Sequence, residues 1–181
     1  FYAAQEKEYR NLKCEDDFLA MLAEGGYQVG ELAKCKYPQG VNVEALDLVE
    51  SEAMTAELLE RNQVVIFEAA VRYENLFIRA DILVKDGENI ELIEVKAKSY
   101  NSQAPEILGA QGGILSGMRP YIEDVAFQAH VFTSAFPEAR LKTYLMMPDK
   151  SVQASVSGLN QLFKIVREGK RSKVITSPNV H

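Results

Sequence analysis

Asp81, Glu94 and Lys96 are the residues of this chain whose types and spacing best suit chemistry. Twelve residues separate Asp81 from Glu94, and an Asp-Gly pair among them predicts a tight hairpin turn. A turn centred between Gly87 and Glu88 places Asp81 directly opposite Glu94 on the neighbouring strand. Opposed Cβ atoms lie ~5 Å apart, where like charges destabilise a sheet unless a cation or a raised pKa resolves the repulsion.

A divalent cation is the simplest partner for these two carboxylates. Mg²⁺ binds carboxylate oxygens and keeps several waters, so Asp81 and Glu94 are predicted to hold Mg²⁺ or Mn²⁺. Lys96 projects from the same face of the sheet, where its ammonium cannot bind the metal but can orient a water or stabilise charge on a phosphate. Two carboxylates, a metal and a lysine together suit hydrolysis of a phosphodiester.

Arg79 leaves a second interpretation open. In the same register Arg79 faces Lys96, so both cations would balance Asp81 and Glu94 in an exposed surface ladder without chemistry. The register also assumes that there is no bulge, because a slip of one residue separates the two carboxylates. The alternate positions are uniformly apolar and are expected to face the core: Ala80, Ile82, Val84, Ile93, Val95 and Ala97.

Strands must position these residues, and the sequence predicts four of them. Segments rich in β-branched and aromatic residues predict strands over 64–73, 75–85, 90–99 and 140–148. The first three form an antiparallel meander, and the Gly-, Ser- and Gln-rich stretch 100–118 is expected to be a loop. The expected fold is α+β, with a mixed central sheet of about four to five strands flanked by helices.

Helical spacing of apolar residues predicts the elements that flank this sheet. The expected helices cover residues 15–24, 29–36, 51–61, 119–136 and 158–170. Gly25 and Gly26 are expected to end the first helix, and Ser51 is a candidate cap for the third.

Length and composition fit one soluble domain covering residues 1–181. The chain begins with Phe, which suits a piece of a longer protein, and it has no secretory signal or apolar run of ~18 residues. Cys14 and Cys35 suit reduced thiols, so we expect a cytoplasmic protein without membrane contact. The net charge of −6 argues against a coat protein for nucleic acid, although residues 164–174 are locally basic.

The segment RADILVKDGENIELIEVKAKS resembles the core of the PD-(D/E)xK nuclease superfamily. The superfamily pattern is an Asp on one strand, about a dozen residues, and Glu-x-Lys on the next, here Asp81, Glu94 and Lys96. Ala80 replaces the proline of the name. The resemblance spans residues 26–148, and the branch that it most resembles contains RecB, CRISPR-associated and phage lambda exonuclease-like nucleases.

The resemblance also implies roles for residues outside this core. Gln128 matches the branch's Gln motif, with Phe132 in place of its Tyr, and Tyr121 and Asp124 would share a helix face with Gln128. Glu31 matches an acidic position on an earlier helix and is the candidate for a third metal ligand. Two further positions are implied: the carbonyl of Val95 as a metal ligand, and Glu68 as another acid.

The resemblance implies a restriction-endonuclease-like fold and a metal-dependent deoxyribonuclease, with an exonuclease preferred, acting in DNA repair or defence. RNA stays open as a substrate, because substrate does not transfer with a fold. One alternative is a catalytically inactive nuclease-like module that binds nucleic acid or another protein. Another is an α/β domain with a charged sheet face and no catalysis. Strand preference, pathway, further domains or partner subunits, and oligomeric state are left open by the sequence.

Overall fold

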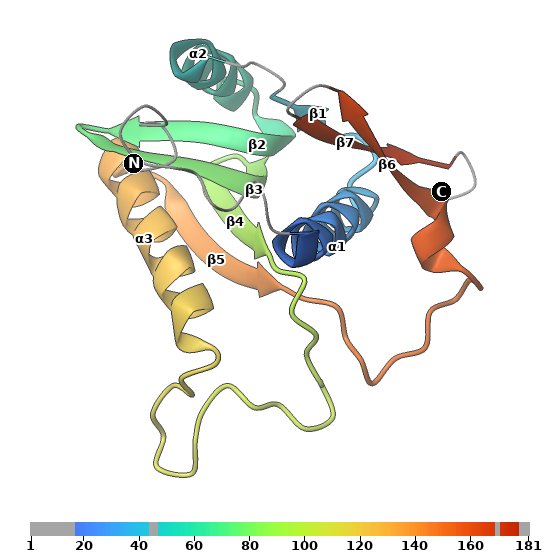
Figure 1. The fold of residues 1–181 in the computed structure, drawn as a ribbon. Helices are drawn as coiled ribbons and strands as arrows, with labels where there is room; N and C mark the ends of the chain where they lie inside the picture. The colour runs from blue at the N-terminus through green and yellow to red at the C-terminus, as the bar shows by residue number, and fades with distance from the viewer. Residues whose placement is uncertain (1–16, 44–46, 169–170, 178–181) are drawn as a thin grey trace, which may run out of the picture.

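The computed structural model describes residues 17–43, 47–168 and 171–177, which form an α+β fold around a mixed sheet (Figure 1). The sheet contains β1 (Val41–Asn42), β2 (Gln63–Tyr73), β3 (Leu76–Asp86), β4 (Asn89–Val95) and β5 (Arg140–Met146). Its strands lie in chain order, with β2, β3 and β4 as an antiparallel meander, β1 parallel to β2, and β5 parallel to β4. The expected fold class is confirmed.

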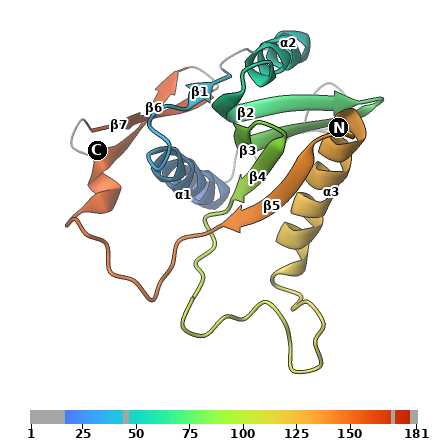
Figure 2. The same ribbon diagram turned by 180° about the vertical axis from the view of Figure 1, so that it is seen from behind.

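Three helices cover the two faces of the sheet. They are α1 (Asp17–Lys34), α2 (Leu48–Leu59) and α3 (Arg119–Ala135). Successive residues of a strand point to opposite faces, and Leu83 and Ile82 accordingly belong to separate apolar clusters. The larger cluster packs α2 and α3 on the sheet through Leu58 and Phe132, whereas the smaller one packs α1 through Ala33 (Figure 1, Figure 2).

The β3–β4 hairpin has the register that the Asp-Gly turn predicted. Asp86 pairs with Asn89 across the turn, and Gly87 has a φ of 60°, which glycine adopts without steric cost. The pairing continues to Ile82 and Ile93 and ends there. β4 itself ends at Val95, four residues before the expected end of the strand at 99.

Helix α1 corrects the prediction of two helices separated at Gly25 and Gly26. The helix continues through both glycines to Lys34. Glycine in a helix interior costs roughly 1 kcal/mol relative to alanine but does not forbid the helix. Packing against the sheet through Ala33, and the hydrogen bond from Gln28 Nε2 to the Phe163 carbonyl at 3.0 Å, hold α1 in place despite that cost.

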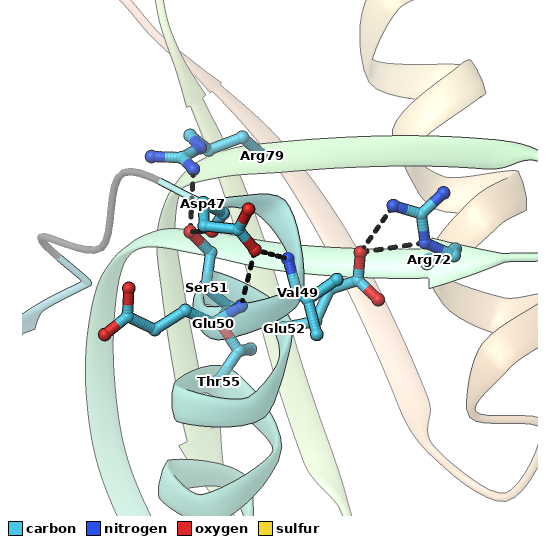
Figure 3. A network of polar contacts seen from close by, with 8 residues as sticks. All are labelled: Asp47, Val49, Glu50, Ser51, Glu52, Thr55, Arg72 and Arg79. Atoms are coloured by element: carbon cyan, nitrogen blue, oxygen red, sulfur yellow. Dashed lines mark hydrogen bonds and ion pairs between the residues drawn. The ribbon is translucent and has the colours of Figure 1, made fainter.

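Helix α2 begins earlier than predicted, so Ser51 is not its cap. Asp47 is the N-cap, and its carboxylate accepts hydrogen bonds from the N–H groups of Val49 and Glu50 (Figure 3). Ser51 is instead fully buried one turn into the helix, where its Oγ accepts a hydrogen bond from Arg79 Nη2 at 3.0 Å. The prediction that Arg79 faces Lys96 is therefore wrong, because its guanidinium extends to α2.

The helix predicted over 158–170 is wrong. A short 3-10 helix at Leu159–Leu162 is followed by a two-stranded hairpin of β6 (Phe163–Glu168) and β7 (Arg171–Thr176). Burial along β6 has a period of two, since Phe163 is buried and Lys164 exposed. This hairpin lies beside α1 in both views (Figure 1, Figure 2).

The stretch between β4 and α3 is a long connection that extends away from the sheet, as expected for 100–118 (Figure 1). A small turn forms within it, where Leu108 and Ile114 make an isolated bridge. None of the helices formed by the described residues combines the length and the apolar character needed to cross a membrane.

Gly25→Ala is expected to stabilise the protein by about 0.5–1 kcal/mol, because alanine is the better helix former. A Cβ at this position meets no atom within 4 Å, so nothing offsets the gain. Urea unfolding of the variant and the parent measures the difference. A loss of stability would contradict a helix that passes through Gly25, since alanine is strained at a left-handed helix end.

Candidate functional site

The candidate site lies where β3 and β4 separate. The N–H of Lys96 donates to the Met146 carbonyl of β5, so the preceding N–H, on Val95, points toward β3. The ladder between β3 and β4 has already ended, and the Asp81 carboxylate accepts this N–H, with Oδ2 2.7 Å from the nitrogen. Asp81 therefore bridges the two strands with its side chain at the point where their backbones part.

Glu68 disturbs β2 directly opposite Asp81. The two residues face each other in the register, but they do not pair, although the pairs on either side of them are regular. Glu68 has a φ of 58°, a left-handed conformation that residues other than glycine rarely adopt. As a result Phe67 and Ala69, which would share a face in a regular strand, belong to the clusters on opposite faces of the sheet.

This reversal corrects the expectation of one uniformly apolar face. On β3, Ala80 packs in the cluster under α2 and α3, whereas Ile82 packs in the cluster under α1. Asp81 lies between them, at the point where the side chains of β3 exchange faces. The carboxylate is thereby brought to a break in the sheet and not onto a regular ladder of surface charges.

Glu94 and Lys96 form one network with two residues of α3. Lys96 Nζ lies 2.5 Å from Glu94 Oε1 and 2.7 Å from Asp124 Oδ2. Gln128 Nε2 donates to Glu94 Oε2 at 2.6 Å and lies 3.5 Å from Asp124 Oδ1. Both Glu94 and Gln128 are buried. The structure thus places Asp124 and Gln128, which the resemblance implied, in contact with the Glu-x-Lys pair.

Tyr121 lies on the same helix but outside this network. Its ring is near Lys98, whose Nζ is 6.0 Å from the ring centroid. Gln128 Oε1 is the one buried side-chain polar atom among the described residues that has no hydrogen-bond partner. An amide oxygen left in this state costs about 1–3 kcal/mol.

Burial and neighbouring carboxylates raise the pKa values of Asp81 and Glu94. Burial raises the pKa of Asp81, and the nearby charge of Glu68 raises it further, while the hydrogen bond from Val95 lowers it. Burial also raises the pKa of Glu94, and the charge of Asp81 adds to the effect. The attraction of Lys96 lowers both pKa values without cancelling the shift.

Lys96 and Asp124 shift in the directions that favour their charged forms. Burial alone would lower the pKa of Lys96, but its hydrogen bonds to Asp124 and Glu94 outweigh burial and raise that pKa. Burial would raise the pKa of Asp124, and the hydrogen bond from Lys96 lowers it below its ordinary value. Lys96 therefore stays an ammonium throughout the working pH range.

A cleft of about 710 Å³ opens on the α1 side of this site. It reaches from Asp81 and Val95 to α1 and to β7, and Glu31 and Glu68 also line it. Glu31 Oε1 is paired with Lys34 Nζ at 2.8 Å. Lys34 was not among the predicted site residues, although its position one turn after Glu31 places both on one helix face.

The donor set fits a hydrated hard cation. No group of three or more His, Cys, Asp and Glu side chains suited to a metal occurs among the described residues. Mg²⁺ and Mn²⁺ need only one or two carboxylates and complete their shells with water. Asp81 and Glu94 supply these carboxylates, and burial raises the pKa of each, an unfavourable state of the charged forms that a cation would relieve.

Searches against protein-family models, curated proteins and solved structures found no match to this chain. The resemblance to the PD-(D/E)xK superfamily therefore stays a prediction drawn from the sequence.

Asp81→Asn is expected to raise the free energy of unfolding at pH 7.5 in EDTA. The raised pKa means that folding favours protonated Asp81. The stabilisation from protonated Asp81 is complete below its pKa in the unfolded chain, ~3.9. It is lost as the pH rises through the higher pKa that Asp81 has in the folded protein. Asparagine keeps the acceptor for Val95 and removes the charge, so its advantage should shrink as the pH falls toward about 4.

Urea unfolding between about pH 4 and pH 7.5 measures the difference in free energy of unfolding between Asp81→Asn and the parent. Glu123→Gln, on the exposed face of α3, is the matched control. An Asp81→Asn variant that is less stable than the parent at pH 7.5 would contradict the strained carboxylate pair.

Proposed function

We propose that this chain hydrolyses phosphodiester bonds of nucleic acid with a divalent cation, as a DNA exonuclease of the PD-(D/E)xK type. The observation that carries the proposal is the meeting of Asp81 and Glu94 at the parting of β3 and β4, with the Lys96 ammonium 2.5 Å from Glu94. A surface charge ladder accounts for it less well, since Glu94 is buried and Arg79 is bonded elsewhere.

Asp81, Glu94 and the Val95 carbonyl would hold the cation. A bound Mg²⁺ or Mn²⁺ supplies Lewis-acid activation of a phosphate oxygen and lowers the pKa of a bound water toward neutrality. Both oxygens of Glu94 already accept a hydrogen bond, yet each carboxylate oxygen has a second lone pair, so this network leaves room for a metal bond.

Lys96, Asp124 and Gln128 stabilise charge on the phosphate or orient the side chains that do so. Lys96, an ammonium at working pH, stabilises the negative charge that develops on the phosphate as the bond breaks. Asp124 holds the ammonium in place, and Gln128 fixes the Glu94 carboxylate from the side of α3. The cleft between Asp81 and α1 gives the substrate strand access to Asp81 and Val95, two of the residues that would hold the cation.

The second candidate is an inactive nuclease-like module that binds nucleic acid or another protein. One observation favours it: Lys96 is already paired with both Glu94 and Asp124, so its charge is partly compensated before any substrate binds. A protein that binds Mn²⁺ but cuts neither DNA nor RNA would match this candidate.

Asp81→Ala is expected to reduce metal-dependent cleavage of DNA by about 10²–10³-fold or more, because it removes one of two metal-binding carboxylates. The assay uses end-labelled single- and double-stranded DNA and the matching RNA, each with Mn²⁺ and with EDTA. Closed circular DNA distinguishes an exonuclease, which needs an end, from an endonuclease.

Glu123→Gln is the matched control, because Glu123 precedes Asp124 on α3 but lies exposed in a pair with Arg119. Its cleavage rate should equal that of the parent. Equal cleavage by the parent and Asp81→Ala would refute the assignment of this site.

A further inference from the structure

Lys34 is a second partly buried cation beside the site, separate from Lys96. Its Nζ lies 2.8 Å from Glu31 Oε1 and 3.7 Å from Glu68 Oε1, so one ammonium pairs with two carboxylates from different elements. The Lys34 side chain is only 18% exposed, although it carries a full charge. Glu31, Lys34 and Glu68 all line the cleft that also exposes Asp81.

The surrounding structure holds Lys34 in this position. Its ammonium is 5.7 Å from the centroid of the Phe67 ring, a favourable cation–π arrangement. Phe67 in turn packs against Gly40, where a Cβ would approach the ring to 2.1 Å, so the ring has little freedom to move. The left-handed backbone of Glu68 brings its carboxylate into the same cleft.

Three carboxylates line the cleft, those of Glu31, Glu68 and Asp81, and their charges are balanced in different ways. Glu31 and Glu68 share the Lys34 ammonium. Asp81 makes no ion pair within 4 Å among the described residues, and the charge of Glu68 acts on it unfavourably. Without Lys34, Glu31 and Glu68 would be two adjacent oxygen donors, the kind of set that Mg²⁺ and Mn²⁺ bind with water.

We propose that Lys34 is a built-in counter-ion that takes the place of a second metal ion, so that the chain binds one divalent cation, at Asp81 and Glu94. Glu31, which the resemblance implied as a third ligand, is thereby removed from the metal-binding set. The inference rests on the proposed function in one respect, that Asp81 and Glu94 bind a divalent cation.

Titration calorimetry with Mn²⁺ tests the inference without relying on cleavage. The parent should bind one ion, and Lys34→Met should bind two, because the mutation frees Glu31 and Glu68. Lys34→Arg keeps the charge and should still bind one ion. The double variant Lys34→Met/Glu68→Gln should return to one.

Two further variants keep the test valid if Lys34→Met fails to fold. Glu68→Gln removes a neighbouring charge but no ligand, so it should change the Mn²⁺ affinity by less than about tenfold, whereas Asp81→Asn should weaken it at least about 100-fold, as expected for loss of a ligand. Three results would each overturn the inference. They are a parent that binds two ions, a Lys34→Met variant that binds one, and a Glu68→Gln variant that loses as much Mn²⁺ affinity as Asp81→Asn. A parent that binds no Mn²⁺ would overturn both this inference and the proposed metal site.

Discussion

The arrangement of the site depends on one hydrogen bond, from the Val95 N–H to the Asp81 carboxylate. A strand that leaves its neighbour exposes backbone N–H groups that must find another acceptor. Here the acceptor is a charged side chain, so the same carboxylate that completes the sheet is also fixed beside Glu94. Because Asp81 is tied to the backbone of β4, its position does not depend on a flexible rotamer.

The opposing strand adapts to this break. Glu68 takes a left-handed backbone conformation across from Asp81, and the side chains of β2 and β3 exchange faces there. The protein therefore carries both backbone strain and a charge conflict at one place in the sheet. Stored cost of this kind is typical of functional sites, where the surrounding packing holds groups in positions that they would not adopt freely.

The hairpin register and its two opposed carboxylates could be predicted from sequence because an Asp-Gly turn fixes pairing and alternation fixes faces. The break at Asp81 and Glu68 could not, since a regular pattern gives no sign of where a ladder stops. The prediction that Arg79 faces Lys96 failed for this reason, because it assumed that the pairing of β3 with β4 continues past Ile82. Lys34 was missed because its partners, Glu31 and Glu68, lie on an α-helix and a strand that only the tertiary fold brings together.

Local signals failed where tertiary packing outweighs them. Gly25 and Gly26 are ordinary helix-ending residues, yet α1 runs through them because its contacts with the sheet and with β6 stabilise it. The segment after Leu162 has apolar residues that suit either a helix or a strand over so short a run, and pairing with β7 decides for the strand.

A crystal grown or soaked with Mn²⁺ and measured near the manganese absorption edge tests the central claim most directly. The account predicts one anomalous peak within bonding distance of both the Asp81 and the Glu94 carboxylates, with the Val95 carbonyl as a third ligand. A crystal saturated with Mn²⁺ that has no peak between these two side chains, or has its peak on Glu31 and Glu68, would contradict it.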